Sequence, residues 1–236
     1  MKTISSTIKL SNGTSEVKCP DTVLDKSNLL QHMMSFCDEK SESIKIPQFI
    51  TRSIISDIVK ALENLDNNYL VTFDLMSLLQ IFEASDFLDI SELTDVLFKV
   101  IIDKLSSDNC FELFQMSKKS MCFKEINDAI VKLIIKLLTE YYEELPLSAT
   151  YIDPYYNRYK FMTFCDIEYI IDSMNSSFTV TKIFIIRNWL QMNERLVTNE
   201  QVKDILNKIN DSACYIPKRK IQFMRDIRDI ILKNFM

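Results

Sequence analysis

The chain has 236 residues, of which 47% are hydrophobic and 26% are charged, and its net charge is -5. This composition supports a folded core and excludes a disordered chain, while the length suits one large domain or two small ones. Because an acidic surface repels phosphate backbones, we expect no general nucleic-acid binding.

The first predicted element is a β-hairpin. Polar and apolar side chains alternate over residues 7–10 and again over residues 15–19, which is typical of strands. Between them stands the pair Asn12-Gly13, which favours a tight turn whose two central residues both have positive φ. The sequence therefore predicts two antiparallel strands at the start of the chain.

Helices predominate over the rest of the first half. Apolar residues at helical spacing, broken by one short alternating stretch, predict the following order: a short helix from Thr22, a helix over 28–36, a strand over 43–46, a helix over 49–64, a turn at Asp66 to Asn68, and two helices with apolar stripes over 75–82 and 90–105. Asp89, with Glu92 three residues later, resembles a capping box that starts the last of these helices.

The second half is predicted to be entirely helical. Its expected helices cover residues 110–120, 123–144, 164–174, 179–191, 199–209 and 218–235. The interval 146–161 interrupts them with two prolines and four tyrosines, Tyr151, Tyr155, Tyr156 and Tyr159. It is interpreted either as a loop held by buried rings or as a contact surface for a partner.

The residues on which most catalytic sites depend are scarce. Gly13 is the only glycine and His32 the only histidine. A phosphate-binding loop needs several glycines, and a nucleophile–histidine pair would have to use His32, which we interpret as a half-buried helix residue. The six cysteines form no CxxC pair and are expected to be free thiols. We therefore expect a protein that is not an enzyme and that holds no metal or cofactor.

Two further features concern location and charge. The chain opens with no secretory signal pattern and has no apolar run of membrane-span length, so we expect a cytoplasmic or nuclear protein that does not associate with membranes. Residues 215–236 contain six basic and two acidic side chains. This segment is either a solvated helix face or a docking patch for an acidic partner.

The order of elements in the first half resembles the BTB/POZ domain family. The stretch from Ala84 to Ile90 is similar to the family's A-x-x-[FY]-L-x-[IV] helix junction. The second half resembles the BACK domain, in which Asp108 to Phe114 corresponds to the first helix and Ile167 to Leu190 to a later helix pair with a tryptophan. The resemblance implies an α+β domain over 1–106 and an all-helical domain over 107–236, in the short form without a kelch propeller that large DNA viruses also encode.

A BTB-BACK resemblance implies a protein-binding adaptor. Members of this family commonly bind a cullin, as substrate adaptors of a ubiquitin ligase, through a motif of a hydrophobic residue, any residue and a glutamate. Phe36 to Asp38 fits that motif with Asp in place of Glu, and Cys37 to Glu39 fits it with a weaker hydrophobe. The cullin-facing residues implied by the resemblance are Phe36, Asp38, Glu39 and Phe111.

Several alternatives stay open at the level of sequence. Phe36 is either a partner anchor or a cap on the core of its own domain. The protein either delivers a substrate protein to a ligase or occupies the ligase as a decoy. A Skp-like or elongin C-like adaptor, and a BTB regulator that assembles with itself as a homodimer without binding a cullin, are the other two readings.

Overall fold

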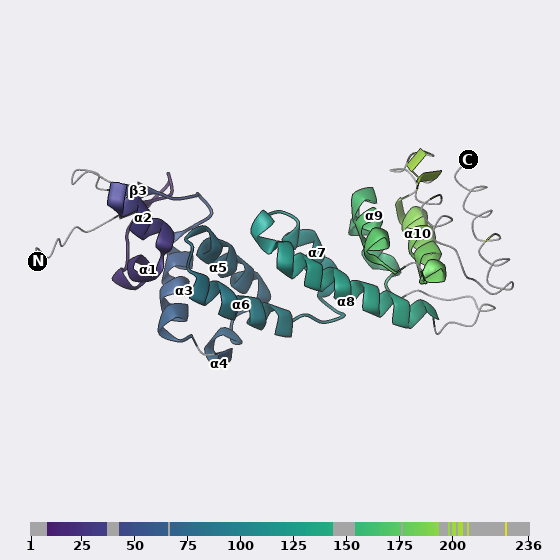
Figure 1. The fold of residues 1–236 in the computed structure, drawn as a ribbon, viewed down its shortest axis with the longest axis horizontal. Coiled ribbons are helices and arrows are strands. Elements are labelled where there is room, and N and C mark those ends of the chain that lie inside the picture. The colour runs from purple at the N-terminus through teal and green to yellow at the C-terminus, as the bar shows by residue number, and fades with distance from the viewer. Residues whose placement is uncertain are drawn as a thin grey trace, which may run out of the picture. The chain divides into compact units, whose positions relative to one another are not determined.

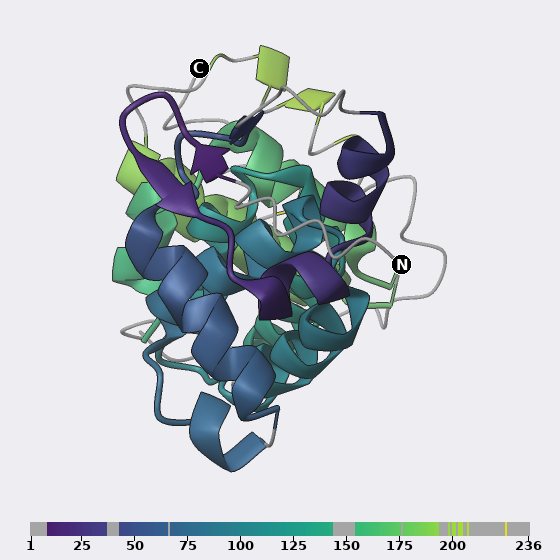
Figure 2. The same cartoon turned by 90° about the vertical axis from the view of Figure 1, so that its left-hand side faces the viewer.

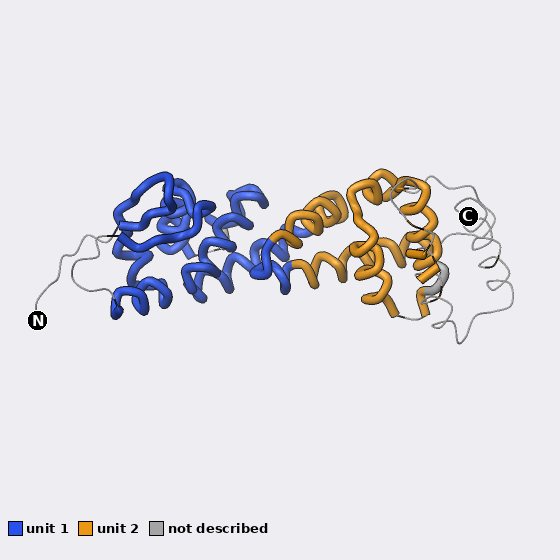
Figure 3. The backbone as a smooth tube through the Cα atoms, turned by 90° about the horizontal axis from the view of Figure 1, so that it is seen from above, with its two compact units in different colours: residues 1–105, 120–126 blue, residues 106–119, 127–236 orange. Residues whose placement is uncertain are grey.

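The computed structural model describes residues 9–36, 43–65, 67–143, 154–175 and 177–193, with seven further single positions (198, 200, 201, 203, 204, 207 and 225). The chain divides into two compact units, which Figure 3 shows in two colours. Unit 1 comprises residues 1–105 and 120–126, and unit 2 comprises residues 106–119 and 127–236. The predicted border at residue 106 did not anticipate that residues 120–126 return to unit 1.

Unit 1 is an α+β unit, as the sequence predicts. Figures 1 and 2 show its short strands beside a group of helices. Its elements are β1 (Lys9–Ser11), β2 (Glu16–Lys18), α1 (Asp21–Lys26), α2 (Asn28–Phe36), β3 (Ser43–Lys45), α3 (Arg52–Glu63), α4 (Asn67–Leu70), α5 (Leu75–Phe87), α6 (Ser91–Asp103) and the 3-10 helix η1 (Met121–Phe123). The predicted strands and helices are confirmed, but part of the turn expected at Asp66 to Asn68 is the short helix α4.

The sheet of unit 1 has the strand order β2-β1-β3. β1 pairs antiparallel with β2 and parallel with β3, so that Leu10 lies between Val17 and Ile44. A parallel neighbour requires a crossover, and here α1 and α2 belong to that connection. Leu10 and Ile44 are both buried, which places one face of the sheet against the helices.

The hairpin turn differs from the expected type. Gly13 has φ +84°, but Asn12 does not have positive φ. The Asn12 side chain instead accepts hydrogen bonds from the backbone N–H groups of Thr14 and Ser15, and its own amide donates to the Ile50 carbonyl at 3.2 Å. The turn is therefore organised by a buried asparagine that also ties the hairpin to the segment before α3.

The predicted capping box at the start of α6 is wrong. Asp89 has φ +52°, a left-handed conformation, and it closes α5: its N–H donates to the Asp86 carbonyl, and the N–H of Ile90 donates to the Ser85 carbonyl. These two bonds form a Schellman motif, which ends a helix at a left-handed residue. α6 then follows Ile90 with no side-chain cap.

The corner between α1 and α2 docks on this α5–α6 junction. Ser27 is fully buried; its hydroxyl donates to the Leu88 carbonyl and accepts from the N–H of Leu30. Next to it Lys26 forms an ion pair with Glu92 at 2.6 Å. The start of α2 is thus held in place by a side chain that satisfies two backbone groups at once.

Replacing Ser27 with alanine should therefore destabilise unit 1. The change leaves a buried carbonyl and a helix N–H without their partner, which costs about 2 kcal/mol of unfolding free energy. Urea unfolding followed by circular dichroism would measure it. Ser35→Ala is the matched control, because Ser35 is exposed and its hydroxyl donates to the His32 carbonyl of its own helix. An equal loss in both variants would contradict the assigned role of Ser27.

Unit 2 is helical in all the parts that the structure describes. Its elements are α7 (Cys110–Ser117), α8 (Lys124–Glu143, of which the first three residues belong to unit 1), the 3-10 helix η2 (Tyr156–Phe161), α9 (Phe164–Ser173) and α10 (Thr179–Asn193). Of the helix predicted over 199–209 the structure describes five positions, all of them helical (200, 201, 203, 204 and 207). Of the helix predicted over 218–235 and the basic segment 215–236 it describes residue 225 alone. No helix in the described ranges is both long and apolar enough to span a bilayer.

Candidate partner-binding surfaces

The end of α2 presents an exposed aromatic ring. Phe36 is the last residue of this helix and is 74% exposed, whereas Leu30 on the same helix is fully buried. The ring of His32, one turn earlier, contacts Phe36 edge to face, with 4.8 Å between the centroids. His32 is itself exposed, which corrects the expectation that it is half-buried. We call His32 and Phe36 the α2 aromatic pair.

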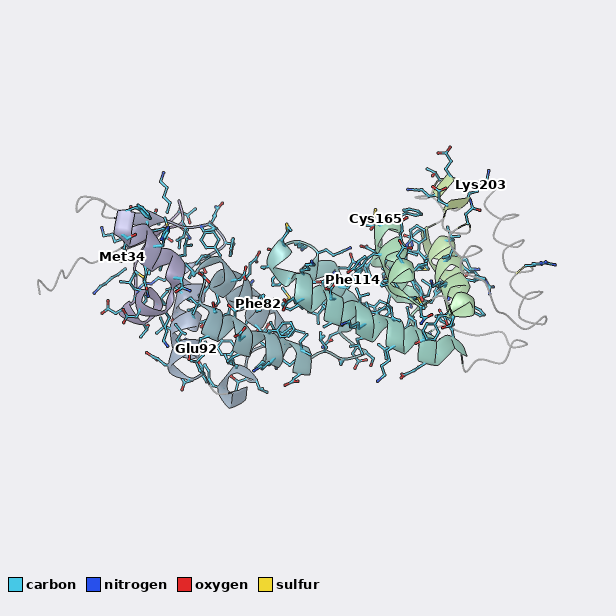
Figure 4. The ribbon with its side chains drawn as sticks, in the orientation of Figure 1. Met34, Phe82, Glu92, Phe114, Cys165 and Lys203 are labelled. Atoms are coloured by element: carbon cyan, nitrogen blue, oxygen red, sulfur yellow. The ribbon has the colours of Figure 1, made fainter. Side chains whose placement is uncertain are left out.

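The α2 aromatic pair lies on a helix that contains no Lys, Arg, Asp or Glu. Its remaining side chains are Asn, Leu, Gln, Met and Ser, and Met33 and Met34 are half-buried beside the pair (Figure 4 labels Met34). Cys37, Asp38 and Glu39, which complete the predicted cullin motif, lie outside the described residues. Of the residues in this predicted motif, the structure describes Phe36 alone.

Phe111 is not a surface residue, contrary to the expectation. It lies in the first turn of α7, is 4% exposed, and its ring stacks on that of Tyr155 with 5.5 Å between centroids. Apolar residues at helical spacing do not distinguish a core position from a partner position. We therefore assign Phe111 to the core of unit 2.

The tyrosine segment is pinned to the core by one fully buried residue, Tyr159. Its hydroxyl lies 3.2 Å from that of Tyr142, which also accepts a hydrogen bond from the Asn188 amide at 2.8 Å. The carbonyl of Tyr159 accepts from Asn193 on α10. These bonds hold η2 against α8 and α10 through groups that are buried and mutually satisfied.

The other tyrosines of the segment divide between core and surface. Tyr155 is half-buried, because its ring packs between Phe111 and Tyr141. Tyr156 is half-buried as well, and Tyr151 lies outside the described residues. For Tyr155 and Tyr159, the structure therefore supports the first interpretation of this segment, a loop held by buried rings.

An ion pair between the buried Asp166 and the exposed Lys118 links α7 to the start of α9. Asp166 is 4% exposed, and its carboxylate accepts from the Lys118 ammonium at 2.6 Å and from the Thr163 N–H at 2.7 Å. Burial acts to raise the pKa of this carboxyl, but the hydrogen bonds from Lys118 and Thr163 outweigh it and hold the pKa below its usual value. Thr163-x-x-Asp166 is also a capping box, a signal present in the sequence.

Two buried thiols, those of Cys19 and Cys110, are poorly suited to nucleophilic chemistry. Burial raises the pKa of Cys19 and of Cys110 to about 11, so both stay protonated at neutral pH. Cys165 on α9 is exposed (Figure 4). No group of three His, Cys, Asp or Glu side chains that could hold a metal ion occurs among the residues the structure describes.

The chain matches no protein-family model and no curated protein.

Proposed function

We propose that this protein is a protein-binding adaptor of the BTB-BACK type, which binds a cullin through the end of α2. The observation that carries the proposal is the 74% exposed ring of Phe36, which directly precedes the segment with Asp38 and Glu39. An exposed aromatic anchor followed by carboxylates matches the chemistry of the motif that this family uses.

The arrangement of unit 1 supports the BTB-like part of the proposal. A hairpin, a helix pair and a third strand parallel to the first precede a helix and a closely packed pair of helices, α5 and α6. The helical character of unit 2 supports the BACK-like part. This division into a mixed unit and a helical unit agrees with an adaptor in which one unit binds a scaffold and the other a substrate.

Phe36 is proposed as the anchor of the interface because it leaves a large apolar surface in contact with water. Interface hot spots are typically aromatic side chains that enter a pocket and become fully desolvated. A ring that is 74% exposed at the end of a helix that contains no Lys, Arg, Asp or Glu is available for such burial. Nearby carboxylates would then pair with donors of the partner.

The test is a binding titration of the full chain with the purified N-terminal region of a cullin. Phe36→Ala removes the anchor and should weaken binding by about 2 kcal/mol, or roughly 30-fold in Kd. Asp38→Lys should weaken it further, because a favourable charge becomes an unfavourable one. Val71→Ala is the matched control, since Val71 is 51% exposed on the same unit.

Equal affinities of Phe36→Ala, Asp38→Lys and the wild type would refute the interface. If no cullin binds the wild type at all, and sedimentation shows that the apparent mass rises with concentration, the protein is instead a self-assembling BTB regulator.

A further inference from the structure

A second surface lies on η2 in unit 2 and has a different character. A 3-10 helix has three residues per turn, so side chains three residues apart lie on the same edge of the helix. Tyr156 and Tyr159 form the inner edge, with Tyr159 fully buried. The two other edges carry Arg158 with Phe161, and Asn157 with Lys160.

Those outer edges combine positive charge with an exposed ring. Phe161 is 61% exposed, and the Lys160 ammonium lies 4.6 Å from the centroid of its ring. Lys160 is exposed and Arg158 half-buried. Residues 154–165 contain no acidic side chain, and none of the ion pairs found within the described ranges includes Arg158 or Lys160.

The backbone beneath this surface is fixed. The Tyr159 carbonyl accepts from the Asn193 amide, and the Met162 carbonyl accepts from the Trp189 indole N–H at 2.8 Å. α9 follows at once, capped by Thr163 and Asp166. A ligand that binds η2 therefore meets side chains on a preorganised support, which lowers the entropic cost of binding.

We propose that Arg158, Lys160 and Phe161, here named the η2 surface, dock a short acidic peptide segment with an apolar side chain beside its carboxylates. Two cations without acidic partners among the described residues complement the carboxylates, and the Phe161 ring contacts the apolar side chain. The inference rests on the proposed adaptor function and names the chemistry of the substrate that unit 2 holds.

The net charge of the protein favours a peptide over a nucleic acid. The Debye length at physiological ionic strength is about 8 Å, so a short peptide interacts mainly with the local cations. A long polyanion would extend past these cations onto the rest of the protein. The protein has a net charge of -5 and repels the polyanion there. The η2 surface is accordingly matched to a short ligand.

The test uses the full chain and a short fluorescein-labelled peptide of Asp and Glu residues around a central leucine, measured by fluorescence polarisation. The double variant Arg158→Glu and Lys160→Glu should weaken binding at least about tenfold, and Phe161→Ala should weaken it about fivefold. The control is Lys124→Glu with Lys132→Glu, which makes the same change in net charge at two exposed positions of α8 and should bind like the wild type.

Three results would overturn the proposal: no peptide binding by the wild type, equal binding by the double variant, or an equal loss in the α8 control. Tighter binding of an oligothymidylate than of the peptide at physiological salt would also overturn it, in favour of a nucleic-acid site. Because this assay contains no cullin, its failure is distinguishable from a failure of the Phe36 titration.

Discussion

Trp189→Ala is expected to be the most destabilising single change in unit 2. Trp189 is 2% exposed, packs against Phe164 with 6.0 Å between ring centroids, and donates its indole N–H to the Met162 carbonyl. Truncation leaves a large cavity and a buried carbonyl without its donor, which together cost about 3–5 kcal/mol. Because Met162 is the C-cap residue directly after η2, the loss should also loosen the η2 surface.

Urea unfolding would measure this effect, followed by far-UV circular dichroism because that signal does not rely on the removed tryptophan. Phe161→Ala is the control, since that ring is 61% exposed on the same unit, and its loss should change stability by no more than about 0.5 kcal/mol. If Trp189→Ala unfolds at the same urea concentration as the control, the packing assigned to Trp189 is wrong.

The second large effect is expected at Asp166. Its replacement by alanine leaves the Lys118 ammonium, which is 30% exposed, without its counter-charge and removes the cap of α9. Because the Lys118 ammonium keeps contact with water, the expected loss is about 1–2 kcal/mol and comes mainly from the cap and the hydrogen bonds of the buried carboxylate. The exposed Asp95 on α6 serves as control: Asp95→Ala should be close to neutral. A loss in Asp166→Ala no larger than in Asp95→Ala would contradict a structural role of the pair.

The same carboxylate predicts a pH dependence. A carboxyl whose pKa is lower in the folded than in the unfolded state binds its proton more readily when unfolded. Its contribution to stability is therefore complete above the unfolded pKa of about 3.9 and disappears as the pH falls through the folded pKa. Wild-type stability should decline in this acidic range more steeply than that of Asp166→Asn. Parallel curves for the two proteins would contradict this assignment.

Most helices of the described chain were predictable because their apolar residues recur at helical spacing. The spacing predicts α3 and α5 within a few residues of their observed bounds, and Asn12-Gly13 predicts the hairpin. The capping pattern, in contrast, gives Asp89 the wrong role, because an aspartate can both start a helix as its cap and end a helix in the left-handed conformation. The left-handed backbone of Asp89 and the bonds of Asp89 and Ile90 to the preceding helix distinguish the two.

The candidate surfaces were less predictable than the fold. Phe36 and Phe111 are both apolar residues at helix ends, yet one is 74% and the other 4% exposed. The difference arises from neighbours distant in sequence, such as Tyr155 over Phe111. Tyr159 is likewise buried by Tyr142 and Asn193, which are 17 and 34 residues away. Sequence shows which side chains are able to bind a partner, while tertiary packing decides which of them remain available.

Hydrogen exchange of the full chain, alone and saturated with the N-terminal region of a cullin, tests the central claim most directly, because it locates a bound partner without a mutation. We predict slower exchange in the last turn of α2 and in the adjoining residues 37–42, with η2 unchanged. Unaltered exchange around Phe36 in a saturated complex, or protection found only elsewhere, would contradict the claim that this protein binds its scaffold through the end of α2.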